Sequence, residues 1–207
     1  MMVDTWWQTV EYLRQGGFVM IPLVIVSVVM WTLIIDRLRV FHSLRRHDVN
    51  AVQAVAMLNE KPSGAATGLR ATLVRDFLAE RAGEASLDKD ILHCCTLHLK
   101  RELDARLAVI AVLAAIAPLL GLLGTVLGMV ETFDVIAVFG TGNSRALAGG
   151  IGVALVTTQS GLLVAIPGLL MSNRLRRASQ QLQLNLDETK SAIERRLNHT
   201  VQLGVSS

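Results

Sequence analysis

The sequence predicts an all-α membrane protein with three transmembrane helices and long cytoplasmic helical extensions. Of its 207 residues, 52% are hydrophobic and 18% are charged, and the mean hydropathy is +0.47, which is too apolar for an ordinary soluble domain. Three segments, 17–35, 107–130 and 146–173, contain no Asp, Glu, Lys, Arg or His. Roughly 20 apolar residues in a helix cross the hydrocarbon core of a bilayer, so each segment is long enough to span it.

Basic residues at the ends of these segments predict their orientation. The first span is followed by Asp36-Arg37-Leu38-Arg39. Other basic residues precede the second span or follow the third: Lys100, Arg101, Arg106, Arg174, Arg176 and Arg177. Because cytoplasmic flanks carry the excess of Lys and Arg, we expect a periplasmic N-terminus and a cytoplasmic C-terminus. The same bias explains the net charge of +3 without a nucleic-acid partner. Trp6, Trp7 and Tyr12 fit an interfacial belt on the periplasmic side.

The polar region 36–106 is expected to fold as helices separated by turns. Apolar spacing predicts helices over Asp48–Asn59 and Gly68–Arg81, with a turn at Lys61-Pro62-Ser63-Gly64 between them. Ser86 is the expected N-cap of the next helix. Along that helix, apolar residues recur every four positions at Leu87, Ile91, Cys95, Leu99, Leu103 and Leu107. We expect this helix to continue without a break into the second span.

The third span is expected to continue as a long cytoplasmic helix. Its apolar stripe recurs in steps of three, four and four residues through Leu175, Ala178, Leu182, Leu186, Thr189, Ile193 and Leu197, an 11-residue period. The tip of the preceding loop is expected at Gly140-Thr141-Gly142-Asn143. The predicted segments are therefore a periplasmic N-terminal segment at 1–16, transmembrane helices at 17–35, 107–132 and 146–173, a cytoplasmic helical region at 36–106, a periplasmic loop at 133–145 and a cytoplasmic C-terminal helix at 174–207.

The second and third spans, with the short loop between them, are expected to form a helical hairpin. Small residues line one face of each of its two helices. The face on the second span contains Gly121, Gly124 and Gly128, and the face on the third contains Gly161. The other members are Ala114, Ala117, Ala154, Thr157, Ala165 and Gly168. Small side chains let helix backbones approach closely where lipid supplies no hydrophobic driving force. Packing within one subunit and close assembly between subunits both account for these faces, and the two interpretations are compatible.

Polar residues occur at membrane depth at Thr125 and in the run Thr157-Thr158-Gln159-Ser160. A single threonine usually satisfies its hydroxyl on the preceding turn of its own helix. Four consecutive polar residues, however, cannot all face one side of a helix. Because polar groups are rarely left in lipid, we expect Thr125, Thr157 and Thr158 to be candidates for a hydrated proton pathway, with a subunit interface as the alternative.

Two prolines, Pro118 and Pro167, lie inside the hairpin spans. Proline removes a backbone hydrogen bond and kinks a helix. The prolines therefore predict either static kinks that neighbouring groups stabilise or hinges that move in a working cycle.

The charge-free runs 107–130 and 146–173 contain no group that titrates. Coupled proton movement normally uses a carboxylate or histidine relay, and the nearest acids, Glu131 and Asp134, come directly after the first of these runs. This combination predicts a channel or motor subunit that takes its proton carrier from a partner. We expect no cofactor and no metal, because the His93-Cys94-Cys95 cluster with nearby His98 lacks a second set of ligands. The sequence also offers no nucleophile–base pair or phosphate loop, which argues against an enzyme.

Two runs in the hairpin resemble motifs of a known family. The run APLLGLLGTVLGM, from Ala117 to Met129, resembles the second-span motif of the MotA/TolQ/ExbB proton-channel family, and Gly150 to Pro167 resembles its third-span motif. The order of anchor, cytoplasmic helical domain and hairpin also matches. Within the family, Phe139–Asn143 and Val156–Gln159 look more like ExbB than TolQ or MotA.

The resemblance implies a function and partners. ExbB-like proteins form a homopentamer in the Gram-negative inner membrane around a single-span ExbD-like partner, whose aspartate carries the proton, and the complex energises a TonB-like protein. Thr125 and Thr158 match pore-lining threonines of the family. Val153 departs from the pattern, because well-known members carry a glutamate there. A TolQ-like role in the Tol-Pal envelope system and a non-conducting membrane scaffold are the alternatives.

Overall fold

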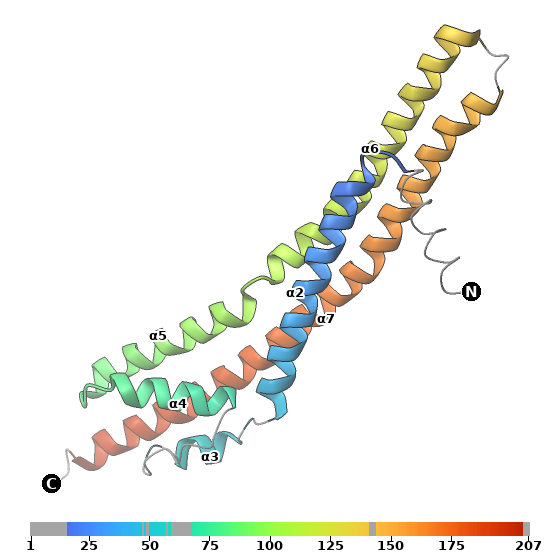
Figure 1. The fold of residues 1–207 in the computed structure, drawn as a ribbon. Coiled ribbons are helices and arrows are strands. Elements are labelled where there is room, and N and C mark those ends of the chain that lie inside the picture. The colour runs from blue at the N-terminus through green and yellow to red at the C-terminus, as the bar shows by residue number, and fades with distance from the viewer. Residues whose placement is uncertain are drawn as a thin grey trace. The chain divides into compact units, whose positions relative to one another are not determined.

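The computed structural model describes residues 16–46, 48, 50–56, 58, 68–140 and 144–204. These residues form helices and no strand (Figure 1). The helices are α2 (Met20–Arg46), α3 (Ala51–Ala56), α4 (Leu69–Glu80), α5 (Ala85–Asp104), α6 (Leu107–Phe139) and α7 (Ser144–Gly204). Three of them, α2, α6 and α7, are long and apolar enough to cross a membrane, which confirms the predicted fold class.

The chain divides into two compact units. The apolar unit consists of Met1–Ile35 and Ala108–Asn173, and the polar unit consists of Asp36–Leu107 and Arg174–Ser207. The division falls close to the ends of the predicted spans. Helix α7 has 61 residues, three times the roughly 20 that a bilayer requires, so it belongs to both units. Its continuation far beyond the third span was predicted correctly.

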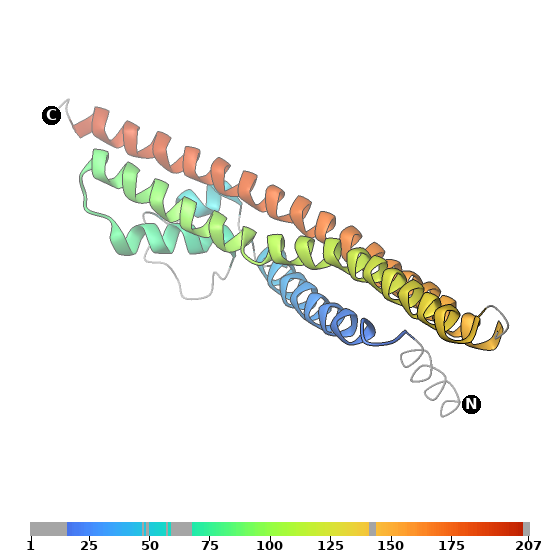
Figure 2. The same cartoon turned by 90° about the horizontal axis from the view of Figure 1, so that it is seen from above.

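In the apolar unit, α6 and α7 run side by side, as both views show (Figure 1, Figure 2). The two predicted faces of small residues are buried and meet each other. A Cβ atom added to Gly161 would lie 2.8 Å from the carbonyl oxygen of Ala117, and one added to Gly128 would lie 2.6 Å from the carbonyl oxygen of Gly150. These distances are shorter than real Cβ contacts, so the backbones approach to a separation that only glycine permits.

Helix α2 packs on this pair with its own buried apolar face. Met30 is fully buried, and a Cβ atom at Gly168 would lie 2.8 Å from its Cε atom and 3.1 Å from the Cβ of Ala114. A second contact gathers Met20 and Leu23 with buried alanines of α6 and α7. Small residues thus form the interface with α2 as well.

In the polar unit, the apolar stripe of α7 forms part of the core. Leu175, Leu182, Leu186 and Ile193 are almost fully buried. From the other helices, the buried side chains are Leu73, Val74, Phe77, Leu92, Cys95, Leu99 and Leu103. Most of the predicted α5 stripe is therefore confirmed, but Leu87 is exposed.

The expectation that the helix before the second span continues into it was wrong. Helix α5 ends at Asp104, Ala105 still donates its N–H to the carbonyl of Arg101, and Arg106 adopts a left-handed conformation with φ of 67°. Helix α6 then begins at Leu107. Because Leu107 remains buried, the four-residue periodicity passes across the break and conceals it. The left-handed conformation costs about 1–2 kcal/mol at a residue with a Cβ atom.

Three other boundaries differ from the predictions. Helix α6 continues to Phe139, because residues 133–139 contain no helix breaker. Gly140, with φ of 68°, then ends it as left-handed glycines commonly do. The expected loop at 133–145 is correspondingly shorter. Among the described residues of the helix expected at Asp48–Asn59, only Ala51–Ala56 are helical, as α3. Helix α5 begins before Ser86, with Glu84 as its N-cap.

Several predicted features lie outside the described residues. They are the aromatic residues Trp6, Trp7 and Tyr12, the turn at Lys61-Pro62-Ser63-Gly64, and Thr141, Gly142 and Asn143 of the loop.

We predict that Gly161→Ala destabilises the helix pair, whereas Gly152→Ala does not. The new methyl group at position 161 would meet backbone atoms of Ala117 and Gly121, while position 152 has no atom within 4 Å. Overpacking of this kind costs about 1–3 kcal/mol, and alanine by itself favours a helix over glycine. Denaturant unfolding in detergent micelles measures the difference. Equal stability of the two variants would show that the close contact is unimportant.

Candidate functional site: hydroxyl groups on the apolar helix pair

Thr125 and Thr158 are half-buried in the apolar unit and keep part of their surface accessible. The Thr125 hydroxyl donates to the carbonyl oxygen of Leu122 at 2.7 Å, and the Thr158 hydroxyl donates to that of Ala154 at 2.9 Å. Each hydroxyl proton is therefore used within its own helix. The oxygen lone pairs remain available as acceptors for water or for a partner's donor.

The two threonines lie at neighbouring levels of the helix pair. A Cβ atom at Gly121 would lie 3.3 Å from the Cα of Thr158, and Thr125 follows Gly121 by one helical turn. Gln159 is exposed and Ser160 is half-buried. These four residues place polar groups on the accessible surface within a short length of the pair.

Thr157 occupies a different environment. It is fully buried, its hydroxyl donates to the carbonyls of Val153 at 2.9 Å and Ala154 at 3.0 Å, and its side chain packs against Gly124. The side chain thus lies inside the helix pair. The pathway prediction consequently rests on Thr125 and Thr158, which retain accessible surface.

Thr132 is a residue that the sequence interpretation missed. It is buried, its hydroxyl donates to the carbonyl of Gly128 at 2.8 Å, and it packs against Gly150. Its position four residues after Gly128 extends the small-residue face by one turn, which is the signal that could have identified it.

The prolines and the acids stand apart from the threonines. Both α6 and α7 continue past Pro118 and Pro167, and a hinge at either position remains a prediction. Glu131 and Asp134 are exposed near the end of α6. Among the residues that the structure describes, no group of three or more His, Cys, Asp or Glu is arranged to hold a metal ion.

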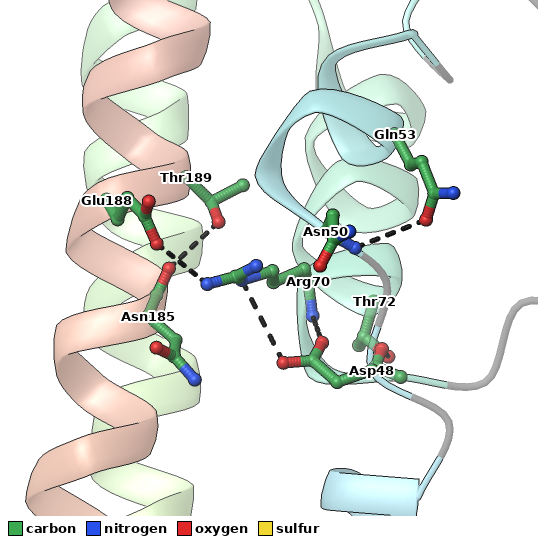
Figure 3. A network of polar contacts seen from close by, with 9 residues as sticks. Asp48, Asn50, Gln53, Arg70, Thr72, Asn185, Glu188 and Thr189 are labelled. Atoms are coloured by element: carbon green, nitrogen blue, oxygen red, sulfur yellow. Dashed lines mark hydrogen bonds and ion pairs between the residues drawn. The ribbon is translucent and has the colours of Figure 1, made fainter.

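The polar unit is held by charged contacts around Arg70 (Figure 3). The backbone N–H of Arg70 donates to the carboxylate of Asp48 at 3.2 Å, and its guanidinium donates to Glu188 of α7 at 2.7 Å. Lys100 of α5 pairs with Asp187 at 2.7 Å. Helices α4 and α5 are thereby both connected to α7 by polar contacts.

Comparisons with known proteins agree with this arrangement. Residues 63–188, which include α4, α5, α6 and most of α7, match the MotA/TolQ/ExbB proton channel family. The chain belongs to this family. It is 33% identical to the biopolymer transport protein exbB1 of Vibrio cholerae, over 90% of this chain and 84% of the relative.

Other relatives also carry the ExbB name. A putative ExbB-like biopolymer transport protein of Synechocystis is 31% identical over 78% of this chain and 81% of its own length. The ExbB of Aquifex aeolicus is 42% identical, over 42% of this chain and 59% of the relative. With three helices that are able to span a membrane, this member of the MotA/TolQ/ExbB family is a multi-pass bacterial membrane protein.

Asp88 caps the turn between α4 and α5 in this family member. Its buried carboxylate accepts hydrogen bonds from Arg81 Nε and from the backbone N–H groups of Ala82 and Gly83, at 2.9 to 3.1 Å. Burial opposes ionisation, but these hydrogen bonds outweigh it and lower the pKa of Asp88. The N-cap role expected for Ser86 was therefore wrong, because Asp88 organises the turn while Ser86 donates to Glu84.

Cys95 shows the opposite shift. Burial raises the pKa of its thiol, and the negative charges of Glu80 and Asp76 raise it further. This environment keeps the thiol protonated and weakly nucleophilic. Cys95 is consequently a core residue, in agreement with its place on the apolar stripe of α5.

We predict that Asp88→Asn lowers the stability of the polar unit by about 2 kcal/mol at pH 7, as expected for lost charge-assisted hydrogen bonds. Because the pKa of Asp88 is lowered on folding, the wild-type advantage is present above the unfolded pKa. It disappears as the pH falls through the still lower folded pKa, so the loss occurs below about pH 4. Chemical unfolding between pH 3 and pH 7 measures it.

The matched control is Asp90→Asn, which removes the same charge from an exposed position two residues away. This variant should change stability by less than about 0.5 kcal/mol. Equal effects of the two substitutions would contradict the capping role of Asp88.

Proposed function

We propose that this chain is an ExbB-like subunit of a motor driven by the proton-motive force in the inner membrane of a Gram-negative bacterium. It forms an oligomeric pore, a homopentamer by family resemblance, around a single-span ExbD-like partner. Through a TonB-like protein, the complex energises transport across the outer membrane. One observation carries the proposal: the charge-free runs 107–130 of α6 and 146–173 of α7 present the accessible hydroxyls of Thr125 and Thr158.

The runs 107–130 and 146–173 contain no titratable side chain. This supports the need for a partner that supplies one. Hydroxyl groups can orient water and accept hydrogen bonds, but they do not take up a proton near neutral pH. In this proposal, the partner's carboxylate takes up and releases the proton, and the threonines hold the water that connects the carboxylate to either side. The valine at position 153 leaves the acid entirely to the partner.

The apolar exterior of the helix pair supports assembly. Large side chains of α6 and α7 are exposed on the single chain, including Leu119, Leu122, Val126, Leu155, Leu163 and Leu170. A surface of this kind requires lipid or other helices to cover it. In the proposed oligomer, part of it contacts neighbouring subunits and the rest contacts lipid.

The proposed orientation places the N-terminus in the periplasm and the C-terminus in the cytoplasm. Arg37 and Arg106 lie at the ends of the first and second spans, and Arg174, Arg176 and Arg177 follow the third. The positive-inside rule assigns these ends to the cytoplasm. The polar unit is then cytoplasmic, as the sequence interpretation expects.

A non-conducting scaffold is the second candidate, and one observation favours it. The hydroxyls of Thr125, Thr157 and Thr158 already donate to carbonyls of their own helices, so a scaffold needs no further role for them. This candidate predicts that their removal leaves function intact. A TolQ-like role is a variant of the leading proposal with a different partner set, and neighbouring Tol-Pal genes would favour it.

We predict that the double variant Thr125→Val, Thr158→Val abolishes most energised transport while leaving assembly unchanged. Valine keeps the branched shape but removes two hydroxyls, each worth about 1 kcal/mol in hydrogen bonding. The sum corresponds to roughly a 30-fold loss of rate. Uptake of a TonB-dependent ligand by cells measures transport, and native gel electrophoresis measures assembly.

The matched control is Thr32→Val on α2. Thr32 also lies in a span and also donates to its own helix, to the carbonyl of Val28 at 2.7 Å, but it is remote in sequence from the hairpin motifs. Cells with the Thr32→Val variant should take up the ligand at the wild-type rate. Normal uptake in the double variant would overturn the proposal in favour of the scaffold.

A further inference from the structure

A pocket of about 460 Å³ lies in the polar unit between α2, α4 and α5. Most of its wall is apolar and consists of Val40, Leu44, Leu69, Leu99, Leu103 and Ala105. Its polar lining is Arg37, Thr72, Glu102 and Arg106. The hydroxyl of Thr72 is occupied, because it donates to the carbonyl of Gly68 at 3.1 Å. The charged groups of the lining are the two arginines and Glu102.

Arg37 is a buried cation without a counter-charge. Arg37 is only 9% exposed. Its Nη1 atom donates a hydrogen bond to the backbone carbonyl of Glu102 at 3.1 Å. Its Nε atom is buried without a partner. Within the described part of the chain, no carboxylate forms an ion pair with it. A buried charge is costly unless it is paired and fully hydrogen-bonded, so Arg37 lacks the ion-pair partner that a buried guanidinium requires.

Arg106 provides a second cation at the same pocket. Its guanidinium pairs with Asp36 at 2.8 Å and is about half exposed. The left-handed backbone of Arg106 separates α5 from α6 and places this residue among the lining residues. Asp36 neutralises part of its charge, and the remaining donors of its guanidinium are available to a ligand.

The position of the pocket in the chain points to the ligand. Arg37 follows the first span by one residue, and Arg106 directly precedes α6. Both residues therefore belong to the ends of spans, where phospholipid headgroups are found. The apolar wall of the pocket is suited to contact the acyl chains of a phospholipid near its glycerol backbone. Glu102 also lines the pocket, and its negative charge disfavours a doubly charged free phosphate more than a singly charged phosphodiester.

We propose that this pocket binds the phosphate group of a membrane phospholipid, with the Nε of Arg37 donating to a phosphate oxygen. Arg106 contributes a second, weaker contact from the rim. The bound phosphate supplies the missing counter-charge of Arg37. The lipid thereby becomes a component of the junction between α2, α4 and α5.

The first test is native mass spectrometry of the full chain, delipidated in mild detergent and titrated with phosphatidylglycerol. The Arg37→Gln variant should bind the lipid about ten-fold more weakly than wild type. The Arg39→Gln variant removes the same charge from an exposed position two residues along α2, and it should bind as wild type does. Equal weakening in both variants would mean that the lipid responds only to surface charge, and would overturn the proposal.

A second pair of variants keeps Arg37 and tests whether the lipid binds in the pocket. This test remains decisive if Arg37→Gln fails to fold. Val40→Trp places a large side chain at the pocket wall and should reduce lipid binding at least ten-fold. Leu38→Trp places the same side chain at an exposed position outside the lining, and it should not. Lipid binding by Val40→Trp at the wild-type level would overturn the proposal.

Two further ligands separate the sources of the phosphate. Diacylglycerol has the same acyl region as phosphatidylglycerol but no phosphate, and we expect it not to bind. Inorganic phosphate at millimolar concentration should not displace phosphatidylglycerol. Displacement would assign the site to a free anion, and equal binding of diacylglycerol would assign it to apolar contacts alone. Either result would contradict a phospholipid phosphate at Arg37.

Discussion

The close approach of α6 and α7 is the constraint on which the apolar unit depends. A Cβ atom at Gly128 or Gly161 would lie 2.6 or 2.8 Å from a backbone oxygen of the facing helix, which is too close, and one at Gly121 would make a tight contact of 3.1 Å. In lipid, this packing replaces the hydrophobic force that holds soluble helices together. The helix pair is therefore stabilised by contacts that depend on close steric fit, and the addition of one methyl group at these positions lowers its stability.

This packing also determines what remains on the surface. Since the small residues face inward, the large aliphatic side chains of both helices point outward, together with the accessible parts of Thr125 and Thr158. Thr157 is the one threonine of its run that fits inside, against Gly124. The division between a buried and an accessible threonine thus follows from the register of two helices. The pathway proposed for this family member depends on that register.

Local patterns in the sequence predicted much of this architecture. Composition predicted three helices able to span a membrane, and helical periodicity predicted the facing small residues and the long continuation of α7; the structure confirms these three features. The break at Arg106 could not be predicted, because neither glycine nor proline marks it and Leu107 preserves the periodicity. The burial of Arg37 could not be predicted either, since it depends on α4 and α5 packing beside α2. The roles of Thr125 and Thr158 remain predictions, because they concern contacts beyond a single chain.

In the proposed function, this chain supplies a proton pathway but no proton carrier. The most direct measurement is proton flux into vesicles that contain the purified chain, compared with vesicles that contain the chain together with the single-span protein that accompanies it from native membranes. We expect no flux above background with the chain alone and clear flux, driven by a membrane potential, with the partner present. Equal flux in both preparations would show that the chain moves protons by itself and would contradict the proposed function.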